Sequence, residues 1–577
     1  MIKYTLTLLL FCCMSCLVQA GGFYLLLEKD TTAVKLKPKY TFRQYKELEQ
    51  FLFDTRARLI NKGYLEASFD SLSRQGDTVF ARLHTGKQYE VDYPVVYTKR
   101  KAIKTAPSLA GVDKQLQEQL RQLENNGYPF AKVSTDSVLL TDTSLTLQYA
   151  VEKGRFITID SFINHGSSKI TKGFIQNYIG IKSGKPYSES RIREIDKLLQ
   201  KLPYATVRQP SSILFREEKA DIHLYLDKRK VNSFDFLVGF LPGSNNGKIL
   251  ITGEVRVHLQ NAFRRGEEVF LQWQRLQPKS QMLDIRFNYP YLLNAPLGVN
   301  FTFKLDKRDS SSLDLAWQLG LPYMTKSNNY IKGFYKYFQT IILAADTTFA
   351  KLNKRLPNNL DAVNNQYGIQ AYYESLDYLF NPRKGFELKI TGSAGVKKIR
   401  PNNQITTLSD PFSPEFNYAG LYDSIQKKSV KGDVFWMGNY YLPMGKKQRH
   451  IFRFGLNGGA VFNRDLLRNE LIRIGGNKLL RGFDEQSIFA SAYQIGTLEY
   501  RMIVQRNSYF FVFMDAAYVR QKFDRKITQD FPFGVGAGIT FETKIGIFGL
   551  TYALGQQKYQ KMDFRNSKLH FGYVAVF

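Results

Sequence analysis

Cysteine is nearly absent from this chain of 577 residues, which has three, at Cys12, Cys13 and Cys16. All three fall in a segment with a basic start, an apolar run and a small residue at Ala20, the parts of a secretory signal peptide. We expect residues 1–20 to be removed, so the mature chain would contain no disulfide and no thiol nucleophile. Cleavage before Cys16 would instead make a lipoprotein, but the residues before it match a lipidation site poorly.

Long apolar runs are also absent. Beyond the signal segment no stretch reaches the roughly 18 uncharged residues of a membrane helix. A chain of this kind can cross a membrane only as a closed β-barrel, in which every backbone polar group is paired. Phe (44) and Tyr (35) are frequent and the mean hydropathy is −0.31, which fits a barrel with aromatic girdles and a polar lumen.

The charge is strongly of one sign, with 81 Lys and Arg against 51 Asp and Glu. A net charge of +30 suits the anionic lipid headgroups of a cell envelope. Nucleic acid is the other partner that such a charge could serve. A signal peptide would remove the chain from nucleic acid, and the cations are scattered along alternating segments, so we expect no nucleic-acid partner.

Motifs of enzyme chemistry are absent from the sequence. It has no Gly-x-Ser-x-Gly elbow, no His-Glu-x-x-His and no metal-spaced Cys/His cluster among its six histidines. The segment 180–185 is one residue shorter than a phosphate loop, and Pro186 follows it where Ser or Thr is required. The glycines of 534–538 lie in a strand-like run with no helix after it. The sequence therefore predicts no enzyme, no cofactor and no metal site.

A weak repeat occupies residues 21 to about 230. Each unit has an amphipathic helical stretch, a stop signal and two strand-like runs. The helical stretches are marked by leucines and isoleucines at helix spacing, around Leu52, Leu120 and Leu199. Stop signals follow at residues 63–64, 127–128 and 203–204. These spacings predict three small modules of the β-α-α-β-β type, of which the first is the least complete in pattern.

From residue 232 the pattern changes to runs of alternating polar and apolar residues separated by Gly, Asn, Pro and Asp. Sixteen such runs are present, and single-chain bacterial barrels have an even number of strands. The length of each run is near the ~9–11 residues that a tilted membrane strand needs. Eleven precede a long glycine-rich loop, at 232–240, 248–262, 267–277, 280–290, 296–306, 311–320, 328–341, 365–378, 385–396, 430–442 and 451–462. Five follow it, at 491–505, 509–519, 533–542, 547–555 and 569–577.

The loop contains the tract 474–484, in which one arginine, Arg481, stands among glycines between strand-like runs. This tract resembles the Arg-Gly-Phe/Tyr motif of the outer-membrane assembly and translocation superfamily, whose members join periplasmic POTRA domains to a barrel and include the BamA/TamA (bacterial surface antigen) family and the two-partner secretion transporters. The resemblance covers nearly the whole mature chain and is most specific in its last hundred residues. Modules at 21–230 resemble POTRA domains, and residues 180–187 resemble the turn before a POTRA second helix.

The resemblance implies a fold of α+β POTRA repeats followed by an all-β, 16-stranded antiparallel transmembrane barrel. The expected division is a signal peptide at 1–20, POTRA-like modules at 21–90, 91–156 and 157–231, and the barrel at 232–577. It implies an outer-membrane location with the N-terminal modules in the periplasm. The protein would receive unfolded outer-membrane clients on its POTRA modules and template their strands at the barrel seam.

The resemblance also assigns roles to residues of the loop and of two strands. The loop-anchoring motif comprises Gly475, Gly476, Arg481, Gly482 and Phe483. In the family the arginine pairs with lumenal carboxylates, which match Glu499 and Asp515 here. The family usually has Gly two residues after the second carboxylate, where this chain has Ala517. Alternation independently puts Phe511, Phe513 and Asp515 on one face, which we assign to the lumen because a charge facing lipid is costly. Without the resemblance, Arg481 would read as an exposed loop arginine.

The C-terminal strand ends in an aromatic residue and resembles the sorting signal that barrel-assembly machinery recognises. The residues concerned are Gly572, Tyr573, Ala575 and Phe577. The same residues could simply close the sheet, and the two roles are compatible. Residues 381–385 match a recurrent turn of these barrels with a structural role.

Three modules favour a TamA-like protein over BamA, which typically carries five. The alternatives are a two-partner secretion transporter, which typically carries two modules and a plug helix, and a passive porin-like barrel. Expected partners are client proteins, a periplasmic partner that could be TamB-like, membrane lipids and lipopolysaccharide. The identity of the clients stays open.

Overall fold

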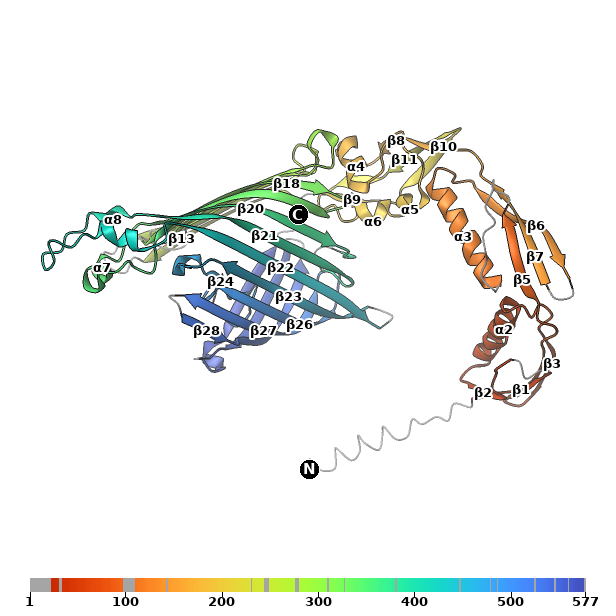
Figure 1. Cartoon of the computed structure of the whole chain (residues 1–577). Helices are drawn as coiled ribbons and strands as arrows, with labels where there is room; N and C mark the ends of the chain where they lie inside the picture. The colour runs from red at the N-terminus through yellow and green to blue at the C-terminus, as the bar shows by residue number, and fades with distance from the viewer. Residues whose placement is uncertain are drawn as a thin grey trace, which may run out of the picture. The chain divides into compact units, whose positions relative to one another are not determined.

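The computed structural model forms two compact units, which we describe separately (Figure 1). One comprises the chain up to residue 159 with 184–192 and 215–220, and the other comprises 160–183, 193–214 and 221–577. The signal segment and the last three residues lie outside the described part of the chain. The structure describes residues 22–30, 34–96, 109–141, 144–229, 231–242, 249–275, 280–308, 311–325, 327–378, 381–445, 448–477, 479–484, 486–523, 526–543, 546–558 and 560–574.

The first module has the elements β1 (Phe23–Lys29), β2 (Lys39–Phe42), α2 (Tyr45–Asn61), β3 (Ser68–Gln75) and β4 (Thr78–His84). Its sheet has the order β2-β1-β4-β3, with β1 parallel to β4. The apolar face of α2 packs on this sheet because Leu48, Leu52 and Leu59 recur at helix spacing and are buried with Leu25 and Leu83. Strand β2 occupies the place where the repeat pattern predicts a first helix.

The second module repeats this topology with β5 (Glu90–Val96), α3 (Leu109–Asn125), β6 (Lys132–Leu140) and β7 (Ser144–Glu152). Its sheet order is β5-β7-β6, with β5 parallel to β7 and β6 antiparallel at the edge. Each of the first two helices ends before a glycine with positive φ, Gly63 at 94° and Gly127 at 97°. A Cβ on Gly63 would lie 2.2 Å from the carbonyl oxygen of Tyr89, so the stop signal also fixes how closely the next segment passes.

The third module has shorter elements. These are β8 (Thr158–Asn164), α4 (Lys172–Ile179), α5 (Glu189–Ile192), α6 (Ile195–Leu199), β9 (Ala205–Val207), β10 (Ser212–Arg216), β11 (Lys219–Leu224) and β12 (Leu226–Lys228). Strands β10, β11 and β8 form one sheet, and β12 pairs with β9. The helical pattern expected around Leu199 divides into α5 and α6, although Ile195, Leu199 and Leu202 are all buried as its spacing predicts.

The large sheet contains a strand in every one of the sixteen runs that the sequence predicts. These are β13 (Ser233–Pro242), β14 (Ile249–Gln260), β15 (Glu268–Arg275), β16 (Gln281–Tyr289), β17 (Val299–Arg308), β18 (Ser312–Met324), β19 (Tyr330–Ile342), β20 (Asp361–Glu374), β21 (Gly385–Arg400), β22 (Lys428–Met444), β23 (His450–Phe462), β26 (Ala492–Ile503), β27 (Tyr509–Phe523), β29 (Phe533–Thr543), β30 (Gly546–Gln556) and β31 (Lys568–Val574). A seventeenth strand, β28 (Lys526–Asp530), extends the hairpin of β27.

Neighbouring strands of this sheet pair in chain order and antiparallel, and Figure 1 shows β18 to β27 running side by side. Short elements in the connections are η1 (Leu292–Asn294), α7 (Thr347–Asn353), α8 (Asn403–Thr406), η2 (Ala419–Ser424) and η4 (Phe564–Asn566). The fold class expected from the sequence, α+β modules followed by a 16-stranded antiparallel sheet, is therefore confirmed. Among the described helices, none is long and apolar enough to cross a membrane.

Side chains alternate along the strands between an exposed apolar face and a polar face. On β27, Phe510, Val512 and Met514 are 48%, 52% and 41% exposed, whereas Phe513 and Asp515 are 5% and 1% exposed. This alternation is what a strand between lipid and a lumen requires. Asp515 lies on the face opposite the exposed apolar side chains.

Helix α4 packs on three turns at one end of the large sheet, all within the second unit. The backbone N–H of Thr171 donates to the carbonyl of Arg264, at 2.9 Å, in the β14–β15 turn. The Asn177 amide donates to the carbonyl of Asn294 at 2.8 Å, and the N–H of Ser327 donates to the carbonyl of Tyr178 at 3.3 Å. The third module is thereby tied to the turns after β14, β16 and β18.

We predict that a lysine is tolerated on one face of β23 and not on the other. Leu456→Lys puts a charge on the exposed apolar face, where it should lower the free energy of unfolding in a bilayer by about 2–4 kcal/mol. Asn457→Lys, one residue along, puts the same charge on the polar face and should change it little. Denaturant titration in lipid vesicles, followed by heat-modifiable gel mobility, measures both. Equal costs for the two variants would contradict the assignment of the faces.

Candidate functional site

The connection between β23 and β26 folds into a structure of its own. It contains η3 (Arg468–Glu470), β24 (Ile472–Ile474) and β25 (Ile488–Ala490), and β24 pairs antiparallel with β25. Leu480 and Phe483 at the tip are 0% and 3% exposed. They share an apolar cluster with Tyr493 of β26 and Val519 of β27, so the tip of the loop lies against the wall of the sheet.

Arg481 lies at this tip and contacts both carboxylates that the resemblance implies. Its Nε and Nη2 donate to the two carboxylate oxygens of Asp515, both at 2.7 Å, in a two-point contact. Its Nη1 donates to Glu499 at 2.5 Å, and its backbone N–H donates to Asp515 at 3.1 Å. All three residues are buried, with 8%, 3% and 1% exposed. A planar guanidinium suits this geometry because its donors match two carboxylates at once.

The ring of Phe513 completes the arginine site. The guanidinium carbon of Arg481 lies 3.4 Å from the centre of that ring, within the range of a cation–π contact. Thr497 donates to Asp515 at 2.8 Å and fixes the carboxylate from the neighbouring strand. The guanidinium thus has carboxylates at its edge and an aromatic ring on one face.

Close approach of the loop to the sheet depends on glycines on both sides. Gly482 has φ +93°, and its carbonyl oxygen lies 2.4 Å from where a Cβ of Gly555 on β30 would stand. The carbonyl oxygen of Arg481 lies 2.1 Å from where a Cβ of Gly534 on β29 would stand. Neither gap admits a side chain, so the loop tip can rest against β29 and β30 only where these strands carry glycine.

Two further glycines of β29 make room for aromatic rings. A Cβ on Gly536 would lie 2.6 Å from the Phe513 ring, and one on Gly538 would lie 2.4 Å from the Phe511 ring. The glycine run 534–538, which does not fit a nucleotide-binding motif, therefore allows other groups to approach the backbone of β29. Alternate glycines in a strand were the available signal, but the sequence does not show which residues approach them.

Glu499 has partners besides Arg481. Arg501 donates to it at 2.8 Å and Arg453 at 3.5 Å, so three arginines surround this carboxylate. Arg501 also donates to Asn381 at 3.1 Å, and Asn381 in turn donates to the carbonyl of Arg506 at 3.0 Å. The turn at 381–385 is thus linked to the arginine site through Arg501. Sequence reasoning missed Arg501, although it shares the strand face of Glu499.

A second buried ionic cluster holds the other end of the loop. Glu470 in η3 contacts Lys397 of β21 through a short hydrogen bond and Lys431 of β22 at 3.2 Å. Lys397 also donates to the carbonyl of Asp465 at 2.7 Å. The side chains of Lys397 and Glu470 are each 1% exposed. Sequence reasoning missed this cluster, because no pattern relates a loop glutamate to lysines about 40 and 70 residues away.

The structure places the remaining site residues as follows. Gly475 and Gly476 precede the tip with φ of 113° and 97°. Ala517, where the family usually has Gly, is 6% exposed and packs in the cluster of Phe483 and Ile495. Gly572 and Tyr573 belong to β31, whose partner is β30, whereas Ala575 and Phe577 lie outside the described residues. No group of three or more His, Cys, Asp or Glu that could hold a metal is found in the described ranges.

Comparison with known proteins identifies the family. The Omp85 superfamily domain matches residues 261–574, more than half of the chain. The chain therefore belongs to the Omp85 superfamily. Members of this superfamily are outer-membrane barrels with periplasmic POTRA domains that act in transport or assembly, so the protein lies in the outer membrane with its N-terminal modules in the periplasm. No curated protein sequence matches the chain.

Solved structures of this superfamily resemble the chain at low identity. CdiB from Escherichia coli matches with a TM-score of 0.51 and 12% identity over 91% of this chain and 96% of that one. CdiB from Acinetobacter baumannii gives 0.49 and 13% over 79% of each chain. BamA from Haemophilus ducreyi lacking POTRA domains 1–3 gives 0.43 and 15% over 84% and 98%. The first of these matches shows a shared fold.

We predict that Arg481 and Asp515 act as one interaction. Arg481→Ala and Asp515→Ala should each destabilise the loop by roughly 3–5 kcal/mol, because each leaves a buried charge without its partner. The double variant should be little worse than either single variant. Protease cleavage between residues 463 and 491 measures loop release, and denaturant titration measures the energies. Additive effects, or a loop that is already cleaved in the parent protein, would make Arg481 an ordinary loop cation.

We also predict the effect of a substitution that leaves every charge in place and tests the contact between the loop tip and β29. Gly534→Ala should release the loop as Arg481→Ala does, since the added Cβ meets the backbone oxygen of Arg481, and the expected cost is about 1–3 kcal/mol. Gly333→Ala is the matched control, because a Cβ there meets nothing within 4 Å. The readout is again cleavage within the loop. An intact loop in Gly534→Ala would show that the tip does not rest on β29.

Proposed function

We propose that this protein inserts or translocates other proteins at the outer membrane. Its three N-terminal modules, at 21–90, 91–156 and 157–231, are POTRA-like domains that receive periplasmic clients, and residues 232–577 form the barrel whose seam templates client strands. The strongest support is an arrangement of free strand edges at both places. Superfamily membership and the shared fold agree with this role, and we propose no catalytic chemistry or cofactor.

Each module carries an edge strand that can accept an extended client. Strands β3, β6 and β10 each stand at one end of their sheets, and among the described residues each pairs on one side. Residues 70–76 of the first module, in and just after β3, are exposed. An edge of this kind binds a strand through main-chain hydrogen bonds, which make little demand on client sequence. Such binding suits a receptor for many unfolded proteins.

The large sheet has the same property at its two ends. Strand β13 pairs with β14 and β31 pairs with β30, and within the described residues no ladder joins β13 to β31. Unpaired backbone groups are very costly in a bilayer, so a loosely joined seam would favour pairing with an incoming strand. We propose that clients enter at this edge.

The loop anchored by Arg481 supports the barrel wall in this proposal. Its ionic contacts reach β26 and β27, and Glu470 reaches β21 and β22. These strands belong to the middle and later part of the sheet. The loop therefore stiffens a wall away from β13. The terminal residues Gly572, Tyr573, Ala575 and Phe577 are proposed to serve this protein's own insertion.

Two-partner secretion is the second candidate, and the similarity in fold to CdiB favours it. In that case one exported partner would replace a range of inserted clients. The count of three modules supports a TamA-like assembly factor with a TamB-like periplasmic partner. A passive porin-like barrel would need neither the modules nor the anchored loop. A neighbouring gene for a large exoprotein would favour secretion.

Locking the seam tests the proposal. Phe236→Cys on β13 and Phe571→Cys on β31, whose ladder partners Val255 and Leu550 both belong to the apolar face, should abolish insertion of a client barrel into vesicles that contain the purified protein when they are joined by a bifunctional thiol reagent. Leu315→Cys and Gln339→Cys are the control, since these residues are partners within the β18–β19 ladder and their link leaves the seam free. The sequence has no cysteine after Cys16 that would interfere. Heat-modifiable mobility of the client measures insertion, and undiminished insertion through a locked seam would refute the seam mechanism.

A further inference from the structure

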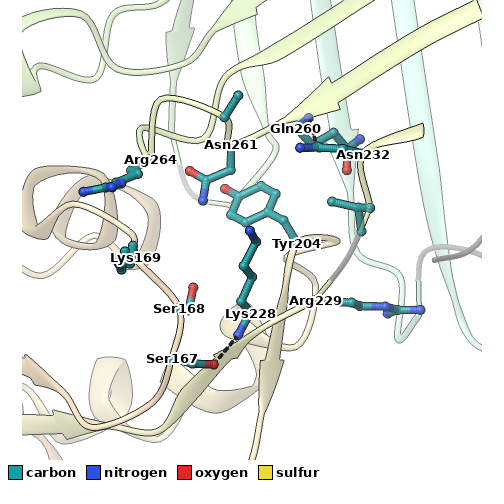
Figure 2. Close-up of a pocket in the computed structure, with 12 residues that line it drawn as sticks. Ser167, Ser168, Lys169, Tyr204, Lys228, Arg229, Asn232, Gln260, Asn261 and Arg264 are labelled. Atoms are coloured by element: carbon teal, nitrogen blue, oxygen red, sulfur yellow. Dashed lines mark hydrogen bonds between the residues drawn. The ribbon is translucent and has the colours of Figure 1, made fainter. Parts of the chain in front are cut away.

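A basic cavity of about 570 Å³ lies in the second unit, between the loop after β8, the end of β12 and the turn that joins β14 to β15. Among the described residues, its lining contains no Asp or Glu and has four cations, which are Lys169, Lys228, Arg229 and Arg264. Figure 2 shows Lys228 extending toward Tyr204 and Asn261, with Lys169 and Arg264 on the side of Lys228 opposite Arg229. Such a lining fits an anionic ligand.

The wall that carries Lys169 and Lys228 is held by hydrogen bonds. The amide of Asn164 donates to the carbonyl of Ser168 at 2.8 Å, and its oxygen accepts the N–H of Leu226 at 2.9 Å. The N–H of Lys228 donates to the hydroxyl of Ser167 at 3.1 Å, as Figure 2 shows. The loop after β8 and strand β12 therefore form one fixed surface.

The opposite wall is a turn with a defined shape. Asn261 and Arg264 both have positive φ, at 55° and 67°, and the side chain of Asn261 accepts the N–H of Gly266 at 2.9 Å. The carboxylate of Glu267, 1% exposed, accepts the backbone N–H groups of Phe263 and Arg265. Arg264 is also tied to the third module through its carbonyl, which accepts the N–H of Thr171. Both walls are thus formed before any ligand binds.

Asp227, next in sequence to Lys228, is occupied by other donors. Asp227 accepts the N–H of Ser167 at 2.9 Å and its hydroxyl at 3.2 Å, and it lies 4.0 Å from Arg208. Hydrogen bonding from the backbone of Ser167 lowers the pKa of Asp227, so this carboxylate is ionised and engaged by Ser167 and Arg208. Across the described part of the chain, no carboxylate forms an ion pair with Lys169, Lys228 or Arg264.

The position of the cavity favours a lipid over other anionic ligands. It adjoins the start of β13 and the turn after β14, at the end of the sheet that carries the periplasmic module. Two phenylalanines beside it are largely exposed, Phe234 at 70% and Phe263 at 68%. Exposed aromatic side chains at the end of a membrane strand mark the level of the headgroups. A basic pocket at that level meets lipid phosphates.

We propose that this cavity binds the phosphate of an anionic phospholipid in the periplasmic leaflet of the outer membrane. Lys169, Lys228 and Arg264 supply the charge, and Ser168 and Asn261 supply neutral hydrogen-bonding groups. The volume exceeds that of a phosphate and admits the rest of a small headgroup, while the acyl chains follow the exposed phenylalanines. The bound lipid would fix the height of β13, the first strand of the seam, in the membrane. This site goes beyond the proposed function, since it would serve insertion and secretion alike.

Native mass spectrometry of the full-length protein tests the proposal, with micelles that contain phosphatidylglycerol or phosphatidylcholine as the probe. The parent protein should retain one phosphatidylglycerol in preference to phosphatidylcholine. Each cation near a membrane surface contributes about fivefold to affinity, so Lys169→Gln, Lys228→Gln and Arg264→Gln together should weaken retention roughly a hundredfold. Heat-modifiable mobility shows whether the triple variant still folds, and if it does not, Lys228→Gln alone should give the fivefold loss.

The matched control removes three other exposed lysines of the same module, Lys182→Gln, Lys185→Gln and Lys197→Gln, none of which lines the cavity. It should keep the retention of the parent protein. Equal losses in the two triple variants would show general charge attraction and overturn the site. Unchanged retention in the cavity variant would do the same. Displacement of the lipid by an excess of inorganic phosphate would assign the cavity to a free phosphate ion instead.

Discussion

The buried contact between Arg481, Asp515 and Glu499 is the interaction on which the arrangement of the loop depends. Removing a guanidinium and two carboxylates from water is costly, and the cost is offset only when all three meet in good geometry. Here the guanidinium makes contacts of 2.5 to 2.7 Å to both carboxylates. Glu499 also forms ion pairs with Arg501 and Arg453. The strands therefore carry an ionic network to which the loop adds Arg481. The position of the loop is thus specified by charges in the wall.

Charge alone would not bring the loop so near the sheet. The ionic contact forms because Gly534 and Gly555 leave the backbone of β29 and β30 bare where the tip of the loop passes. Gly536 and Gly538 let the rings of Phe513 and Phe511 approach the backbone of β29 closely, and the Phe513 ring also contacts the guanidinium of Arg481. Glycine weakens a strand, and here the space is filled by the loop backbone at Gly534 and Gly555 and by the two rings at Gly536 and Gly538. The anchored loop and the glycine-rich strands therefore depend on each other.

The sequence predicted the strands well and the site in part, for physical reasons. A strand between lipid and a lumen must alternate, so all sixteen runs were visible as a period of two. Arg481, Glu499 and Asp515 were named through the family resemblance, and alternation alone chose only the face of Asp515. Glu470 with Lys397 and Lys431, and Gly534 with Gly555, were not predicted, because their contacts join segments whose proximity exists only once the sheet curves. The strand β2 in place of a helix was missed because residues 31–44 lack a clear period.

The ionic contacts of Glu470 and Arg481 join the loop to the later strands of the sheet. Glu470 holds the loop to β21 and β22, Arg481 holds it to β26 and β27, and Asp484 reaches Lys568 at the start of β31 at 2.7 Å. The last contact is exposed and therefore weak. These three contacts all reach β21 or later strands. The later strands are thus stiffened as a group, so opening of the seam would move β13 and its neighbours, which are held instead by the packing of α4 on their turns.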